Sequence, residues 1–142
     1  MKKTKVPLEL INLQDNGFHL LVEVFVFGQI FNVVLDTGAS KTVLDKTTVE
    51  KYTNLEELLS SDHLSTGLGV TNMESHEIHL DSFKVGKLKL KNFKVAVLDL
   101  SSISYAYESL SLPPVIGVLG GDILFQHQAV IDYNNLVLTL TL

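Results

Sequence analysis

The sequence predicts an all-β domain, either a sandwich or a barrel, on three observations. Short runs rich in valine, leucine and phenylalanine recur along the chain, and several alternate apolar with polar residues as half-buried strands do. Glycine, asparagine or proline separates most of these runs, which is typical of turns. The chain has 142 residues, 46% hydrophobic and 19% charged, which suits one domain with a substantial core.

The apolar runs and turn signals place the strands in order along the chain. Gly28-Gln29, Gly86 and Asn134-Asn135 are the expected hairpin turns. We expect strands at residues 18–27, 30–35, 41–44, 115–118, 129–133 and 136–142, and a mostly extended stretch over residues 64–100.

Helix is expected in two places and an irregular loop in one. Asp45 can cap a short helix that runs to about Ser60, either continuous or broken around Thr53-Asn54, with good helix formers at residues 55–59. A helical turn is expected after Gly120-Gly121. Residues 101–114 end in two prolines and are predicted to be a loop.

Charge and composition exclude several classes of function. A formal net charge of −5 argues against a nucleic-acid surface, which requires a basic face. The absence of cysteine excludes disulfides, a thiol nucleophile and cysteine metal sites. The basic start is not followed by the apolar stretch of a signal peptide, and no apolar run approaches the ~18 residues of a membrane span. We therefore expect a cytoplasmic protein with no nucleic-acid or membrane partner.

Asp36 is the strongest candidate for chemistry. It ends an apolar strand and is followed at once by Thr37 and Gly38. A partly buried carboxylate is costly unless it is paired or hydrogen-bonded, and Gly38 lets another backbone or a substrate approach closely. The alternative is an ordinary Asp-Thr-Gly turn without chemistry, because aspartate and glycine are common turn residues.

The residues around this tripeptide resemble those of the retropepsin-like aspartic proteases. The first motif is "VLDTGAS", residues 34–40, and the second is "VIGVLG", residues 115–120, followed by "DIL" at residues 122–124. The ending "AVIDYNNLVLTL" is similar to that of bacterial members. The resemblance covers roughly residues 20–142.

This resemblance implies a closed β-barrel with one or two short helices and a flap hairpin over the cleft. It places the protease domain at residues 16–142 and leaves residues 1–15 as an N-terminal segment, a candidate interface strand. It implies no metal or organic cofactor. The implied site comprises Asp36 as the catalytic residue, Thr37, Gly38, Ala39 and Ser40 as its support, Ile116, Gly117 and Gly120 in the second motif, and Gly67, Leu68 and Gly69 at the tip of a flap over residues 64–73.

The aspartic mechanism requires two carboxylates that share a proton, and the sequence contains one Asp-Thr-Gly. An active enzyme is therefore expected to be a homodimer with Asp36 and its copy at the two-fold axis, acting on a peptide or protein. Thr37 is expected to bond across the axis, and the Gly38 amide to orient the carboxylate. The resemblance also implies that Ala39, where pepsin-like enzymes have serine, leaves the pair working nearer neutral pH.

Two alternatives stay open on the sequence. The barrel can serve as a non-proteolytic peptide-binding or interaction module, since fold alone does not establish function. Asp122 can be a helix cap or the partner of a buried group, and the cap is favoured. His76 and His79 are three apart in an extended stretch and face opposite ways, which argues against a metal site.

Overall fold

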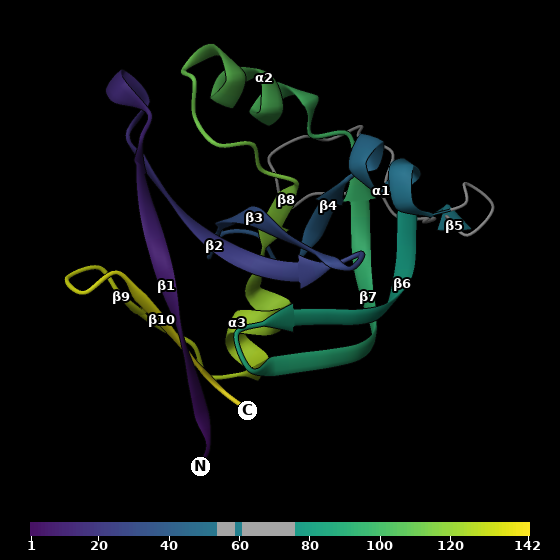
Figure 1. The fold of residues 1–142 in the computed structure, drawn as a ribbon, viewed down its shortest axis with the longest axis vertical. Coiled ribbons are helices and arrows are strands. Elements are labelled where there is room, and N and C mark those ends of the chain that lie inside the picture. The colour runs from purple at the N-terminus through teal and green to yellow at the C-terminus, as the bar shows by residue number, and fades with distance from the viewer. Residues whose placement is uncertain (54–58, 61–75) are drawn as a thin grey trace.

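The protein is built mainly from β-strands, as Figure 1 shows for the computed structural model. The structure describes residues 1–53, 59–60 and 76–142. Its strands are β1 Lys3–Asn12, β2 Phe18–Val26, β3 Gln29–Leu35, β4 Val43–Asp45, β5 Leu59–Ser60, β6 His76–Val85, β7 Leu88–Leu98, β8 Gly117–Leu119, β9 Val130–Asp132 and β10 Val137–Thr141. Its helices are the 3-10 helix η1 Gln14–Asn16 and the α-helices α1 Lys46–Tyr52, α2 Ser101–Ser109 and α3 Gly121–Gln126.

Six of the strands close into a barrel. They neighbour one another in the order β2–β3–β8–β4–β7–β6, and the ring closes where Phe25 of β2 pairs with Lys84 of β6. The pairs β3–β8 and β4–β7 are parallel, whereas the hairpins β2–β3 and β6–β7 are antiparallel. The predicted closed β-barrel is confirmed.

The barrel core follows the alternation seen in the sequence. On β2, Val22, Val24 and Val26 are buried, while Glu23 between them is exposed. Leu138 and Leu140 on β10 are fully buried in the same core. Each fully buried side chain of this kind contributes roughly 1.5–3 kcal/mol relative to an exposed one, and this burial determines which face of each strand turns inward.

Helix α2 replaces the first part of the loop predicted for residues 101–114, so that prediction was wrong for residues 101–109, whereas residues 110–114 are turn and irregular structure as expected. The Asp99 side chain accepts a hydrogen bond from the Ser101 amide at 2.9 Å, just before the helix begins. Tyr107 is only 2% exposed, and its hydroxyl lies 2.7 Å from Nδ1 of His19. Burial raises the pKa of Tyr107 to about 12. Its ring belongs to a second apolar cluster, with Ile11, Leu13, Leu21, Val34, Ala39, Val115 and Val118.

Helix α1 begins as predicted but is shorter than expected. It ends at Tyr52, and Leu59 and Ser60 form β5, so the predicted helix is wrong at that end; residues 54–58 lie outside the described part. Asp45 occupies the cap position but makes no side-chain cap bond to α1. Its carboxylate instead accepts a hydrogen bond from the Leu100 amide at 2.9 Å.

Most of the observed turns lie at or next to the glycines at which they were predicted. The turn between β2 and β3 is centred on Phe27 and Gly28, with φ values of 55° and 75°, rather than on Gly28-Gln29 as predicted. Two successive positive φ values suit the right-handed twist of a hairpin. The turn at Gly86 and the helix after Gly120 are both confirmed.

The N-terminal segment belongs to the same sheet as the barrel strands. Residues 3–7 of β1 pair with β10, and residues 8–12 pair with β2. The two termini lie side by side in Figure 1, and the Leu142 amide donates to the Lys2 carbonyl at 2.9 Å. That this segment contributes a strand to a dimer interface stays a prediction. None of the helices in the described ranges has the length and apolar character needed to cross a membrane.

We predict that Gly86→Ala destabilises the fold more than Gly28→Ala. Both glycines have positive φ, so alanine strains the backbone at each by roughly 1–2 kcal/mol. A Cβ at Gly86 would also lie 2.7 Å from Oγ1 of Thr4 and 2.8 Å from Val6, whereas Gly28 has nothing within 4 Å. Chemical denaturation of both variants measures the difference in the free energy of unfolding. Equal losses would show that the contact with β1 is unimportant.

Candidate active site

Asp36 lies in the loop that joins β3 to β4. Its side chain is half-buried, Thr37, Gly38 and Ser40 are exposed, and Ala39 is buried in the second apolar cluster. The Gly38 amide donates to Oδ1 of Asp36 at 2.9 Å, and the Ala39 amide donates to the Asp36 carbonyl at 3.2 Å. The loop therefore folds back on the carboxylate and holds one of its oxygens.

The second motif lies directly beside the first. β3 and β8 are parallel neighbours, with Leu35 opposite Leu119. The Asp36 amide donates to the Leu119 carbonyl at 3.0 Å, and the Gly121 amide donates to the Ala39 carbonyl at 2.7 Å. The stretch from Leu119 to Gly121, which is far from the loop in the sequence, thus binds it at both Asp36 and Ala39.

The glycines of the second motif allow this close approach. A Cβ at Gly117 would clash with the Val43 carbonyl oxygen, and one at Gly120 would lie 2.5 Å from the Lys41 carbonyl oxygen. Contacts this short to backbone atoms cannot be relieved by a side-chain rotation. Ile116, next to Gly117, is buried in the barrel core.

Asp122 fixes the far end of the loop, and the favoured prediction of a helix cap was wrong. Gly120 is the cap residue of α3, and Asp122 lies in the first turn. The Thr42 amide lies 3.0 Å from each Asp122 carboxylate oxygen, and the Thr42 hydroxyl donates to Oδ1 at 2.8 Å. Thr42 is fully buried, so Asp122 is the partner of a buried group. Sequence reasoning did not single out Thr42, and a lone threonine gives no signal of such a role.

Two other acids near the loop are already engaged. Both oxygens of Asp122 accept hydrogen bonds from Thr42, and Asp45 is 7% exposed and accepts from Leu100. Asp36 keeps one carboxylate oxygen for which the described residues provide no hydrogen bond. A half-exposed acid on a loop fixed by backbone contacts can exchange a proton with a bound water or with a second acid.

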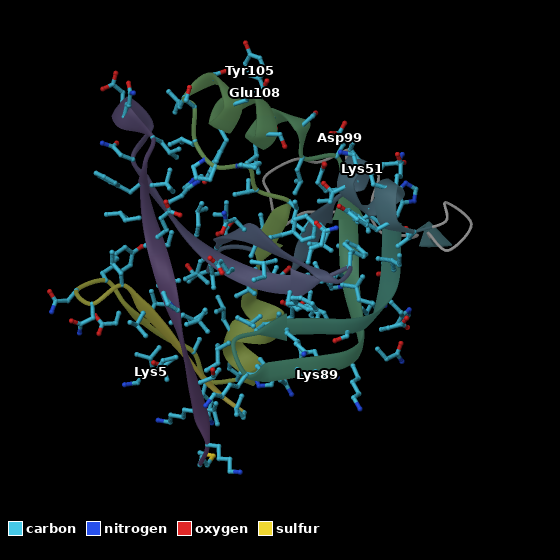
Figure 2. All side chains as sticks on the ribbon, viewed as in Figure 1. Lys5, Lys51, Lys89, Asp99, Tyr105 and Glu108 are labelled. Carbon is cyan, nitrogen blue, oxygen red and sulfur yellow. The ribbon has the colours of Figure 1, made fainter. Side chains whose placement is uncertain are left out.

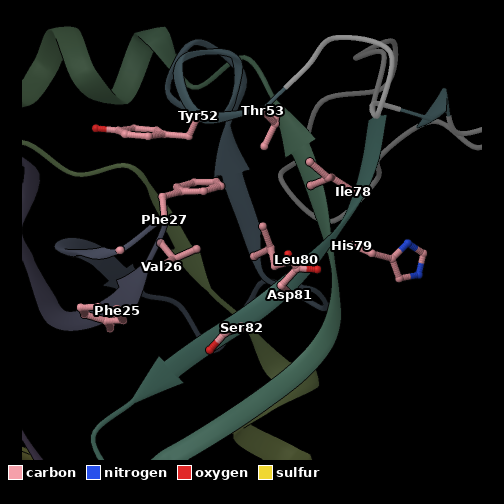
Figure 3. A pocket seen from close by; sticks show the side chains of 11 residues that line it. Phe25, Val26, Phe27, Tyr52, Thr53, Ile78, His79, Leu80, Asp81 and Ser82 are labelled. Atoms are coloured by element: carbon pink, nitrogen blue, oxygen red, sulfur yellow. The ribbon is translucent and has the colours of Figure 1, made fainter.

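A hollow of about 620 Å³ lies at the other end of β3 from Asp36. Figure 3 shows the rings of Phe27 and Tyr52 lying over one another in it, with centroids 5.0 Å apart, and His79 pointing away from them. The seven residues of β3 separate Asp36 from the Gly28 edge of this hollow by about 23 Å along the strand, at ~3.3 Å per residue. Despite its size, it is not next to the candidate chemistry.

The predicted flap lies outside the part of the chain that the structure describes. Residues 64–73, with Gly67, Leu68 and Gly69, therefore stay a prediction. Among the described residues there is no group of three potential metal ligands.

We predict that Thr42→Val weakens the fold by roughly 1–3 kcal/mol, because it leaves Asp122 and the Gly120 amide short of a partner. The change keeps the shape of the side chain and removes the hydroxyl alone. Thr139→Val, at a half-buried position on β10, is the matched control and should change the free energy of unfolding by less than about 0.5 kcal/mol. Denaturant titration of both variants checks this, and equal effects would contradict it.

Comparison with known proteins agrees with this geometry. The family model described as aspartyl protease matches residues 22–123, which include both motifs. A search of curated proteins found no match. Among solved structures, the chain is similar to a retropepsin-like aspartic protease from Rickettsia conorii, with 24% identity, a TM-score of 0.61, and coverage of 98% of this chain and 90% of the other.

Two further structures share the fold. The retroviral protease-like domain of Ddi1 from Leishmania major is 20% identical, with a TM-score of 0.60 and coverage of 86% of this chain and 87% of that one. EIAV protease, solved with the inhibitor HBY-793, is 21% identical, with a TM-score of 0.54 and coverage of 75% and 85%. At these identities the likeness establishes the retropepsin-like fold. The family model covers most of the chain, including the Asp36 loop and the strand that supports it. This protein therefore belongs to the aspartyl protease family.

Proposed function

We propose that the protein is an aspartic endopeptidase that acts as a homodimer, with Asp36 of each copy forming the catalytic pair. The observation that carries the proposal is a single Asp-Thr-Gly on a loop fixed by the second motif, with Thr37 and Gly38 exposed at the surface. Membership of the aspartyl protease family supports peptide hydrolysis in general.

The second carboxylate is best supplied by another copy of the chain. Asp122 and Asp45 are engaged in hydrogen bonds that hold the loop and helix α2. A two-fold axis beside Asp36 brings two identical carboxylates together, because a symmetric dimer interface uses the same surface on both copies. Two acids this close share one proton, since both cannot ionise easily.

The shared proton gives each acid a role in hydrolysis. The ionised Asp36 removes a proton from a water held between the two acids, and the protonated Asp36 of the other copy donates to the scissile carbonyl oxygen. The oxygen of the water bonds to the carbonyl carbon. The Asp36 that took the proton from the water then gives it to the amide nitrogen, and the C–N bond breaks. The carbonyl re-forms as one hydroxyl of the tetrahedral intermediate returns its proton to the Asp36 of the other copy, which restores the pair.

Neighbouring residues are proposed to position the pair and the substrate. The bond from the Gly38 amide supports a role in orienting the Asp36 carboxylate. Thr37 is proposed to bond across the two-fold axis, and Ala39 and Ser40 to complete the loop. The substrate is a peptide bound in an extended form through its backbone. The flap at residues 64–73 is proposed to cover it.

Asp36→Asn is expected to lower kcat/KM for an unfolded polypeptide by at least about a hundredfold, because asparagine cannot exchange the proton. A peptide with a hydroxymethylene group in place of the scissile carbonyl should inhibit the unmodified protein, as it mimics the tetrahedral intermediate. Proteolysis is measured by the appearance of new amino termini.

Asp81→Asn is the matched control for Asp36→Asn. Asp81 is an exposed acid on β6 that lines the hollow at the other end of β3. This variant should cleave at the rate of the unmodified protein. Full cleavage by Asp36→Asn would refute the proposed mechanism, and a folded dimer that binds peptides without cutting them would favour the binding module.

The pH–rate profile tests the expectation attached to Ala39. Alanine has no hydroxyl to donate to the Asp36 carboxylate. The charged form of that carboxylate therefore accepts one stabilising hydrogen bond fewer than in a site with serine at this position. We expect kcat/KM for the unfolded polypeptide to reach its maximum above about pH 4. An optimum below that value would contradict the expectation.

A further inference from the structure

Phe125 is an aromatic side chain that helix α3 presents to solvent. It is 86% exposed, and among the large hydrophobic residues of the described ranges only Met1 is more exposed. Its neighbours Ile123 and Leu124 on α3 are buried, so the helix faces the barrel with one side and presents Phe125 on the other. One exposed ring alone is ordinary, but an aromatic ring that borders an apolar hollow beside a candidate active site is suited to be the central contact of an interface.

Phe125 borders a hollow of about 470 Å³ that reaches the Asp36 loop. Thr37, the residue after Asp36, forms one wall. Gly121 forms another, and its amide is bonded to the Ala39 carbonyl at 2.7 Å. The described residues that line the hollow are Thr37, Gly121, Leu124, Phe125, Gln128, Ala129 and Ile131. The hollow, which we call the Phe125 hollow, is therefore continuous with the surface that must face a second Asp36.

The charge of the Phe125 hollow suits a second copy of the same chain. None of the described residues that line it is charged, although the chain as a whole carries a net charge of −5. Two copies repel one another in general, and like charges placed opposite each other cost binding energy. Contact through an uncharged apolar surface avoids that cost.

We propose that Phe125 of each copy inserts into the Phe125 hollow of the other. This inference rests on the proposed homodimer and adds the contact that holds it. A two-fold axis requires each surface to contact its own copy, and Phe125 and its hollow lie on one surface, so the two insertions occur together. Because Thr37 lines the hollow, the inserted ring would press on the loop that carries Asp36 and so couple dimer formation to the active site.

Phe125→Ala is expected to raise the dimer dissociation constant at least about tenfold, as for a central aromatic contact. Sedimentation equilibrium measures this constant. Cleavage of the unfolded polypeptide should fall at low protein concentration and recover as the concentration rises. Circular dichroism should be unchanged, because the ring is exposed in the single chain.

Tyr105→Ala is the matched control. Tyr105, labelled in Figure 2, is a 74% exposed aromatic on α2, which Figure 1 shows at the top of the molecule, apart from α3. Its removal should change neither the dissociation constant nor cleavage. An equal weakening by both variants would overturn the inference, because it would reflect a general loss of apolar surface.

Cysteine pairing tests the geometry, since the chain has no cysteine of its own. An equal mixture of Phe125→Cys chains and Ala129→Cys chains should form a disulfide-linked pair under mild oxidation, because Ala129 lines the Phe125 hollow. A mixture of Tyr105→Cys and Ala129→Cys chains should not. Linkage in both mixtures would overturn the inference, and so would linkage in neither at a protein concentration at which Phe125→Ala chains are dimeric.

The results separate this inference from the proposed function. A dimer that cleaves, loses cleavage with Asp36→Asn and is unaffected by Phe125→Ala would overturn the contact and leave the catalytic pair in place. A monomer at every concentration would overturn both. A dimer that Phe125→Ala weakens but that never cleaves would support the contact and refute the protease.

Discussion

The close contact between the two motifs is the constraint on which the rest of the site depends. Gly117 and Gly120 have no side chain, so β8 and the start of α3 can lie against the backbone of residues 41–43. Thr42, fully buried, donates its amide and hydroxyl to Asp122 across 80 positions of sequence. These contacts hold the loop in place, and proton transfer requires a carboxylate that is held in place.

The barrel explains why the loop is at its surface. β3 runs through the core with Val33 and Leu35 turned inward, and it ends where β8 ends beside it. Asp36 is therefore the first residue beyond the core, with its backbone held and its side chain half free. The buried side of the loop, at Ala39, packs in the cluster that Tyr107 of α2 completes. Helix α2 supports the site from outside the barrel without contributing a group to it.

Prediction from the sequence succeeded where local pattern reflects burial. Alternating valines on β2 and leucines on β10 identified strands, because one face of each must be apolar. It failed at α2, whose serine-rich start has no clear helical periodicity and whose formation depends on burying Tyr107 against the barrel. It also placed the first hairpin turn one residue late, at Gly28-Gln29 instead of Phe27-Gly28, since a non-glycine residue with positive φ is uncommon.

The sequence by itself determined the fold class, the two motifs and the candidate Asp36, because each can be recognised from residues that are neighbours in the sequence. Only the tertiary structure decided what the other acids do. Asp122 and Asp45 look alike as turn or cap residues, yet one binds Thr42 and the other binds Leu100, 55 positions away. Each of these acids binds a buried backbone group that needs a hydrogen-bond partner. Which backbone groups are buried in this way depends on how distant strands pack.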